Sequence, residues 1–316
     1  MATLKELNTK ITSLKQTKKI TSAMKLIATT RFNKMLTVMQ KSRAYVAALN
    51  DLYSYIKASD EPLTSVQHAA TKEKTQAVQF VVFTSDRGLC GSFNSAVIKT
   101  FEETLLSYKE QECHVDFIGN RGYEYFKNSP HISKARLLGD FTKKVSFVEL
   151  LPYANEYLRQ FNEGSRTRLI GVYNEFVSTI SQKPRVHCLL PFEVEPQSPN
   201  THNNALNDAH HKNDDTKPTD HKQTKPKMIG PMIFEPDVKT LVTHYVQEMI
   251  RFNLYQFLIQ SVTGEHAARM TAMDNATRNC DDLIDSLTLE RNRVRQAAIT
   301  TELTEIISGA EAAATA

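Results

Sequence analysis

Glycine and proline are missing from long stretches at both ends of this sequence. No glycine occurs before Gly88 and no proline before Pro62, and neither residue occurs between Gly264 and Gly309. Both residues destabilise helix interiors, glycine through its backbone entropy and proline through its missing N–H group. Their absence predicts one long helix over residues 3–58 and another near the C-terminus, which continues through Gly264 or bends there.

Cysteine is scarce, and long apolar runs are absent. The four cysteines form no C-x-x-C pair, which argues against a disulfide framework and against a zinc site (Cys90, Cys113, Cys188 and Cys280). No stretch approaches the eighteen or so apolar residues of a membrane span. The lysine-containing N-terminus has no apolar segment, so it does not read as a signal peptide. Any membrane association is therefore expected to go through another protein.

No motif in the sequence indicates an active site. The glycine-rich stretch TSDRGLCGSFNS could cradle a phosphate between a strand and a helix. It is neither G-x-G-x-x-G nor a P-loop, so a tight strand-to-helix turn is the favoured interpretation. Cys90 could be a nucleophile with His114 or His187 as its base, but no spacing supports this, and a packing role is favoured. We therefore predict no catalytic, cofactor-binding or metal-binding residues.

Charge is distributed unequally along the chain, whose formal net charge is +4. Ten lysines or arginines but only one acid, Glu6, occur from Met1 to Arg43. After Gly264 the pattern reverses, with nine acids against five arginines. The two terminal helices are thus complementary in charge. The basic front helix could also bind nucleic acid, but no aromatic stacking platform accompanies its lysines.

Both terminal helices carry apolar residues at seven-residue spacing. In the first helix one row contains Leu7, Leu14, Ala28, Met35, Leu49 and Ile56, with Thr21 and Ser42 between them, and a second row is broken by Lys18 and Lys25. The C-terminal helix repeats the pattern more weakly at Met273, Cys280, Leu287 and Val294, and Thr277 and Arg291 interrupt its companion row. Such rows indicate a coiled-coil seam. The alternative, two surface helices of an ordinary bundle, fits helices of this length poorly.

The middle of the chain has the pattern of a small α/β domain. Apolar runs around residues 78–86, 113–120, 167–177 and 187–192 read as strands. They alternate with helical stretches at 95–108, 121–128 and 147–161, which predicts a mainly parallel sheet covered by helices.

Residues 195–227 have a different composition, with four prolines, four histidines and almost no apolar residues. We predict a disordered insertion, because such a segment buries too little surface to offset its ordering entropy. Its histidines have no fixed spacing, so a solvated loop is favoured over a metal site. The predicted organisation is an N-terminal helix over 1–60, an α/β domain over 76–192, this insertion, and a C-terminal helix over 233–311.

Six motifs together resemble a known family. The stretches KITSLKQTKKITSAMKLIATTR, SDRGLCGSFN, GNRGYEYF, SQKP and FEPD, with the C-terminal helix from EHAARM onward, are similar to the gamma subunit of the F-type ATP synthase. The resemblance covers the chain except the insertion. It implies an antiparallel coiled coil flanking a small Rossmann-like α/β domain, and a non-catalytic rotor without cofactors that couples proton-driven rotation of the c ring to ATP synthesis. The implied partners are the alpha, beta, epsilon and delta subunits and the c ring, with no nucleic acid and only indirect membrane contact.

The resemblance also implies partner contacts for ten residues. It puts Met24, Lys25 and Arg269 at the lower rim of the catalytic hexamer and Asp86 and Arg87 beside the shaft. It puts Glu235 near the epsilon subunit and the c ring, and assigns four residues to the bearing region within the hexamer (Arg295, Gln296, Thr300 and Glu302). The insertion contains no cysteine pair, so the thiol regulation of chloroplast members is not implied.

Two other functions stay open on the residues alone, namely a nucleotide-binding α/β enzyme and a basic coiled-coil scaffold for nucleic acid. Nucleotide titration and the salt dependence of DNA binding would separate them from the rotor. The lack of a transit peptide favours a peripheral protein on the cytoplasmic face of a bacterial inner membrane over one on an organellar inner membrane.

Overall fold

A computed structural model describes residues 3–58, 77–139, 141, 145–191, 235 and 237–314. The chain divides into two compact units, which we call the terminal unit (Met1–Thr30 with Arg269–Ala316) and the central unit (Arg31–Ala268). The predicted insertion at 195–227 lies outside the described residues, so its proposed disorder stays a prediction.

Two long helices contribute to both units. Helix α1 spans Leu4–Ala58 and helix α5 spans Val238–Ala314, which confirms the long terminal helices expected from the missing glycine and proline. A capping box begins α1, because the Thr3 N–H donates to the Glu6 carboxylate at 3.1 Å and the Glu6 N–H donates to the Thr3 hydroxyl at 3.3 Å. Helix α5 continues through Gly264.

The central unit contains one five-stranded sheet in the order β3-β2-β1-β4-β5. Its strands are β1 (Ala77–Phe83), β2 (Glu112–Ile118), β3 (Lys134–Leu138), β4 (Arg168–Phe176) and β5 (Gln182–Leu190). The β1–β2, β1–β4 and β2–β3 pairings are parallel, and only β4–β5 is antiparallel. The sheet is therefore mainly parallel, as expected. Strand β3 was not predicted, and β5 begins before residue 187, the predicted start.

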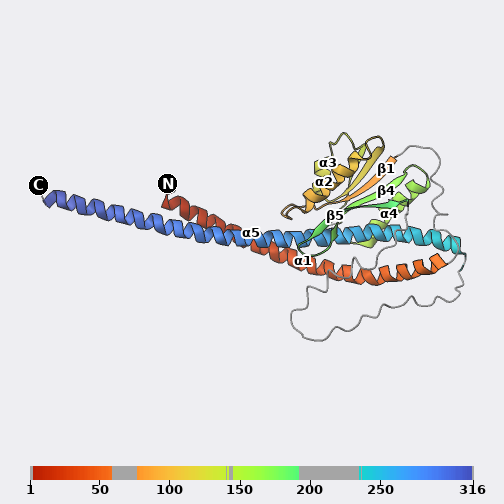
Figure 1. Ribbon diagram of the computed structural model, residues 1–316, viewed down its shortest axis with the longest axis horizontal. Helices are drawn as coiled ribbons and strands as arrows, with labels where there is room; N and C mark the ends of the chain where they lie inside the picture. Colours follow the sequence, from red (N-terminus) through yellow and green to blue (C-terminus); the bar gives the residue numbers. More distant parts are fainter. Residues whose placement is uncertain are drawn as a thin grey trace, which may run out of the picture. The chain divides into compact units, whose positions relative to one another are not determined.

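Helices cover both faces of this sheet (Figure 1). On one face, α2 (Phe93–Leu106) and α3 (Asn120–Phe126) enclose a core that includes Phe80 and Phe117. On the other, α4 (Phe147–Asn162) and the two long helices enclose a second core that includes Phe83. Every residue of β1 is buried, as a parallel strand covered on both faces requires.

Helix α5 packs very closely against the sheet. The Phe257 ring stacks on Tyr173 with centroids 4.1 Å apart, and a Cβ atom on Gly171 would lie only 2.7 Å from Phe257 Cε2. Residues 257–268 are buried on every side of the helix. This section of α5 is thus an internal element of the central unit, not a surface helix.

Helix α1 runs antiparallel to α5 within the central unit. The Gln256 amide donates to the Ser42 hydroxyl at 2.9 Å, and the Tyr53 and Tyr245 rings stack with centroids 6.2 Å apart. Ser42, which interrupts the apolar row in the sequence, is therefore matched by a polar residue on α5. Its hydroxyl also donates to the Met39 carbonyl at 2.8 Å, so this half-buried polar group is satisfied.

Candidate partner-binding surfaces

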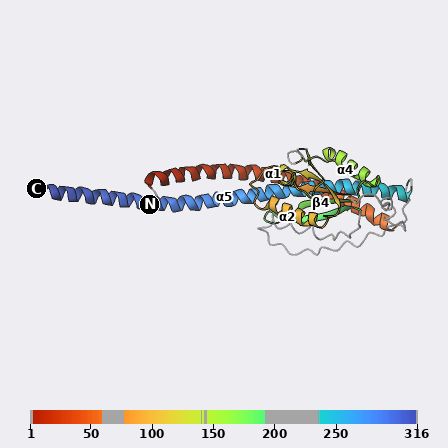
Figure 2. The same cartoon turned by 90° about the horizontal axis from the view of Figure 1, so that it is seen from above.

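The two helices of the terminal unit are also antiparallel (Figures 1 and 2). Three polar pairs fix their register. The hydroxyls of Thr21 and Thr277 lie 2.8 Å apart. One turn away on α1, Lys25 Nζ contacts Asp274 at 2.6 Å, and Lys18 Nζ contacts Asp281 at 2.5 Å. Lys18 lies seven residues before Lys25 in α1, and its partner Asp281 lies seven residues after Asp274 in α5. This is the matching that an antiparallel pair of helices requires.

Of the residues predicted at the hexamer rim, Lys25 belongs to one of these pairs and Met24 lies beside it. Met24 is 37 % exposed on α1, whereas the neighbouring Lys25 is engaged by Asp274. The sequence reasoning missed Ile20 and Ile27, which are 57 % and 56 % exposed and share the helical face of Met24. Together the three residues form an apolar strip on α1 outside the helix seam. Their spacing of four and three was the signal that could have found them.

Arg269 and Glu235, two further predicted contacts, lie in different surroundings. Arg269 is half-buried on α5 at the start of the second segment of the terminal unit. Glu235 is exposed at a bend just before α5 begins. The carboxylate of Asp237, two residues further on, accepts a hydrogen bond from the Thr240 N–H at 3.2 Å and so caps the first turn of α5. The roles assigned to Arg269 and Glu235 stay predictions.

The end of α5 carries the four residues predicted for the bearing. If the alignment of Thr21 with Thr277 is continued along the two helices, Leu4, the first residue of α1, lies opposite Val294. Residues 295–314 of α5 therefore extend beyond the start of α1 (Figure 1). The four predicted residues lie in this extension and are exposed, and the Thr300 hydroxyl bonds back to the Gln296 carbonyl at 2.9 Å (Arg295, Gln296, Thr300 and Glu302).

The same extension presents an apolar face to its surroundings. Ile299, Leu303 and Ile306 are 49 %, 54 % and 67 % exposed and follow one another at four- and three-residue spacing. Ile307, beside them, is 58 % exposed. Helices in proteins owe most of their stability to the packing of an apolar face, and a contiguous exposed apolar face is typical of a binding surface. The extension therefore has the character of a helix that a partner surrounds.

The glycine-rich turn after β1 has a structural role. The Asp86 carboxylate accepts a hydrogen bond at 3.1 Å from the N–H of Asn120, the first residue of α3, and so caps that helix. The Asn94 side-chain oxygen accepts from the Ser85 N–H at 3.0 Å, and the Ser85 hydroxyl donates to the Arg87 carbonyl at 2.7 Å. The side chains of Ser85 and Asn94 are thus committed to holding the turn itself. Arg87 is exposed.

The next turn approaches the first so closely that it requires glycine. Gly119 has a φ of +100°, and a Cβ atom there would lie 2.1 Å from the Thr84 carbonyl oxygen. The Thr84 hydroxyl in turn accepts a hydrogen bond from the Gly122 N–H at 3.0 Å. The ends of β1 and β2 are therefore locked together by backbone contacts, which fits the tight-turn interpretation of the sequence.

A buried ionic cluster joins β2, β3 and α4. The Asp116 carboxylate is 6 % exposed and accepts hydrogen bonds from Arg136 Nε at 2.9 Å and from the Tyr157 hydroxyl at 2.6 Å. The hydrogen bond to Asp116 raises the pKa of the Arg136 guanidinium, and burial raises the pKa of the Tyr157 phenol well above its usual value. Groups with shifted pKa values can mark active sites. Here they satisfy one another, so a structural role explains them.

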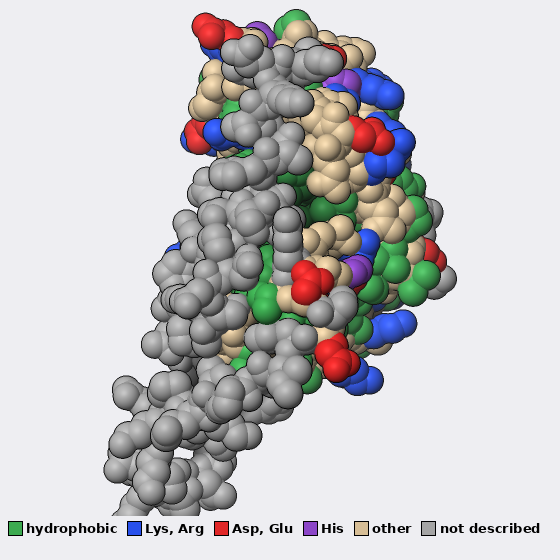
Figure 3. Space-filling model, turned by 90° about the vertical axis from the view of Figure 1, so that its right-hand side faces the viewer, with side chains coloured by type: hydrophobic (Ala, Val, Ile, Leu, Met, Phe, Trp, Pro, Cys, Tyr) green, Lys and Arg blue, Asp and Glu red, His purple; other side chains and the backbone are tan. Residues whose placement is uncertain are grey.

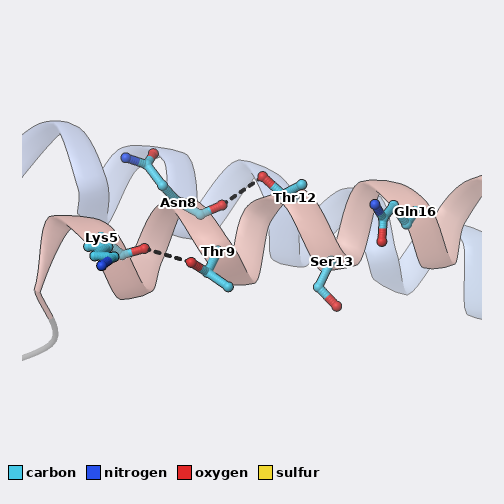
Figure 4. A pocket seen from close by; sticks show the side chains of 6 residues that line it. All are labelled: Lys5, Asn8, Thr9, Thr12, Ser13 and Gln16. Carbon is cyan, nitrogen blue, oxygen red and sulfur yellow. Dashed lines mark hydrogen bonds between the residues drawn. The ribbon is translucent and has the colours of Figure 1, made fainter.

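A groove in the terminal unit lies along α1 (Figure 4). It is shallow, encloses about 620 Å³ and is lined by Lys5, Asn8, Thr9, Thr12, Ser13 and Gln16. The hydroxyls of Thr9 and Thr12 donate to the carbonyls of Lys5 and Asn8, each at 2.9 Å. Figure 4 shows the lining side chains spread along one helix instead of converging on a point, so the groove is a poor ligand site.

The described residues show neither a metal-binding cluster nor a membrane-spanning helix. Among them, no group of three His, Cys, Asp or Glu side chains lies close enough to hold a metal ion. None of the described helices combines the length and the apolar character needed to cross a membrane. On the face drawn in Figure 3, positive and negative side chains of the described residues are interspersed. This differs from the basic stripe typical of nucleic-acid binding.

Comparison with protein families and sequences gives a match over nearly the whole chain. A family model described as "ATP synthase" matches residues 3–313. The ATP synthase gamma chain of Bdellovibrio bacteriovorus is 35 % identical over 316 residues, covering 99 % of both chains. The ATP synthase gamma chain of Psychrobacter arcticus is 30 % identical with the same coverage.

Comparison with solved structures shows the same fold. The chain resembles one in the rotor of the Euglena gracilis mitochondrial ATP synthase with a TM-score of 0.57 and 16 % identity, over 94 % of this chain and 98 % of that chain. A second chain, from an OSCP/F1/c-ring structure of the same enzyme, gives a TM-score of 0.60 and 17 % identity over 98 % and 94 %. At these identities the likeness concerns the fold alone.

Proposed function

Because the chain belongs to the family of ATP synthase gamma chains, we propose that its paired terminal helices form the coiled-coil shaft of the rotating central stalk. The chain itself is a non-catalytic subunit, and ATP is made or hydrolysed elsewhere in the complex. It couples rotation of the c ring to conformational change in the catalytic subunits. The comparisons support neither the nucleotide-binding enzyme nor the nucleic-acid scaffold.

One observation carries this proposal, namely the exposed end of α5 beyond the start of α1. Its apolar face needs cover, and a ring of alpha and beta subunits around it would supply that cover. The proposal assigns Arg295, Gln296, Thr300 and Glu302 to contacts with this ring, where they would flank the apolar face. The apolar strip at Ile20, Met24 and Ile27 would meet the rim of the same ring.

The asymmetry of the extension explains how turning it would change nucleotide affinity. Ile299 and Leu303 share one side of the helix, whereas Glu302 and Glu305 put negative charge beside that apolar face. A catalytic subunit therefore meets different contacts at each rotary angle. A partner can shift a conformational equilibrium only by its differential contact free energy with the two states. An asymmetric helix supplies such a difference without any catalytic group of its own.

The remaining assignments complete the proposal. Glu235 would lie near the epsilon subunit and the c ring, and Asp86 and Arg87 would lie at the edge of the α/β domain beside the shaft. The delta subunit belongs to the same complex. The gamma chain is part of a membrane-associated complex, and we assign it to the cytoplasmic face of a bacterial inner membrane. An organellar inner membrane is the alternative.

The test uses the full chain co-expressed with the alpha and beta subunits. We expect Leu303→Asp with Ile307→Asp to reduce recovery of the alpha and beta subunits about tenfold or more, because buried apolar anchors dominate interface energies. The matched control is Leu106→Asp with Val148→Asp, which puts the same two charges on side chains of α2 and α4 that are 51 % and 71 % exposed. Equal recovery with the double variant and with the control would contradict the proposal.

A second measurement addresses the enzyme alternative. Titration of the isolated chain with ATP should give no saturable binding, because the polar groups around Ser85 and Asn94 are bonded to one another. Saturable binding that Asn94→Ala abolishes would favour the nucleotide-binding alternative.

A further inference from the structure

The seam between α1 and α5 in the terminal unit contains charged residues where apolar residues are expected. Leu7, Ile11 and Ala28 are nearly inaccessible, as a helix seam requires. Between them, Lys18 and Lys25 occupy steps of the second apolar row. Replacing apolar contacts by charges in a seam normally costs stability. The presence of these two lysines in the seam therefore needs a physical explanation.

Each lysine is paired with an aspartate of α5. Lys18 contacts Asp281 and Lys25 contacts Asp274, and both pairs are only partly exposed, with side-chain accessibilities between 25 % and 45 %. The aspartates, like the lysines, are one heptad apart. The hydrogen bond to Lys25 lowers the pKa of Asp274, with burial acting in the opposite direction. The lowered pKa keeps the Asp274 carboxylate ionised at neutral pH, as its ion pair with Lys25 requires.

A hydroxyl pair occupies the layer between the two ion pairs. The Thr21 and Thr277 oxygens are 2.8 Å apart, and each is also within reach of a carbonyl of its own helix, at 3.0 Å and 2.7 Å. Two hydroxyls have two protons, so one donates across the seam and the other donates within its helix. Thr21 is 8 % exposed, and this exchange leaves neither oxygen without a partner.

We propose that Lys18, Lys25, Asp274 and Asp281 form a pairing code that directs α1 to α5 and prevents it from pairing with α1 of a second copy of the chain. This code acts within the chain itself and is separate from the function of the chain as a rotor. Its physical basis is that α1 carries two positive charges in the seam and α5 carries two negative charges. The electrostatic interaction is attractive only when α1 pairs with α5.

The alternative pairings show how the code discriminates. If two α1 helices paired antiparallel about Thr21, Lys18 of each copy would lie opposite Lys25 of the other. Two α5 helices paired about Thr277 would likewise oppose Asp274 and Asp281. Both arrangements put like charges together twice, whereas the α1–α5 pair joins opposite charges twice. Charges at the edges of helix seams set partner choice in this way.

The first experiment reverses one pair in the full chain. Lys18→Asp should speed amide hydrogen exchange on both helices around this layer about fivefold, because an attraction becomes a repulsion at a partly exposed site. Adding Asp281→Lys restores an opposite-charge pair and should return the exchange rate close to that of the parent. The control, Lys19→Asp, makes the same charge change on an exposed neighbour.

The second experiment tests discrimination against a second copy. Lys18→Met with Lys25→Met removes the repulsion between α1 helices and should raise the self-association constant in sedimentation about tenfold. The control is Lys15→Met with Lys19→Met, which removes the same charge from exposed positions and should leave association unchanged. The pairing code would be overturned if the two double variants self-associated equally. It would also be overturned if adding Asp281→Lys to Lys18→Asp failed to slow amide exchange again.

Discussion

Removing Arg136 should expose how strongly the buried ionic cluster holds the sheet to α4. Asp116 receives two hydrogen bonds from Arg136, from Nε at 2.9 Å and from Nη2 at 2.7 Å, and one from Tyr157. Arg136→Met keeps much of the side-chain volume but deletes both bonds. The carboxylate, 6 % exposed, is then left with a single neutral donor.

The expected loss follows from the burial of the two partners. Breaking a fully buried ion pair costs about 3–5 kcal/mol, because the remaining charge is left uncompensated. Arg136 is itself 36 % exposed, so water can reach part of the vacated space. We therefore expect Arg136→Met to cost about 2–3 kcal/mol, which corresponds to about 30- to 150-fold faster exchange. The loss should be concentrated in β2 and β3, which the pair connects.

The assay is amide hydrogen exchange of the full chain, read separately for β2, β3 and the rest of the central unit. The matched control is Arg159→Met on α4, since Arg159 pairs with Glu163 at the surface with side chains 68 % and 54 % exposed. That pair should contribute about 0.3–0.5 kcal/mol. If both arginine variants changed exchange equally, the stabilising role given to the buried pair would be refuted.

Two further predictions address the packing of α5 and the terminal ion pairs. Gly171→Ala should destabilise the central unit by about 1–3 kcal/mol in urea unfolding, because its Cβ atom would displace the Phe257 ring, whereas Gly309→Ala in an open helical site should not destabilise the chain. Unimpaired stability of Gly171→Ala would show that α5 can shift at no cost. The Lys25 bond lowers the pKa of Asp274 below its usual 3.8, so this pair stabilises the fold above that pH and is lost as the pH falls through the lowered value. In an NMR titration, Lys25→Met should raise the pKa of Asp274, and an unchanged value would argue against the pair.

The long helices and most strands could be predicted because their signals are local. The absence of glycine and proline gave the extent of α1 within one or two residues, and buried apolar runs indicated β1, β2 and β4. Strand β3 was missed because Lys134–Leu138 is short, lies at a sheet edge and has only one buried residue. The early start of β5 was missed because it contains Pro184, which an edge strand tolerates.

The partners of individual side chains could not be predicted, because they depend on register between distant segments. Lys18 and Lys25 could be recognised in the sequence as breaks in an apolar row. Their matching to Asp281 and Asp274 requires the antiparallel alignment of helices about 250 positions apart, as the separation of 249 for Lys25 and Asp274 shows. The same holds for Asp86, whose capping of α3 depends on how β1 and β2 end beside each other.

The wrapping of α5 by the central unit has a consequence for how the protein is made. Ser42 and Gln256, which bond in the finished core, are 214 positions apart. At about 5–20 residues per second, a ribosome needs on the order of 10–40 s to make the second after the first. The core on the α2 and α3 face can close early, because all its members lie between Val78 and Val172. Across the sheet, Phe83 and Tyr173 must wait for α5, and so must Ile56 of α1. The growing chain is thus open to aggregation on this face of the sheet until translation passes residue 268, and a chain truncated before that point would stay in this state.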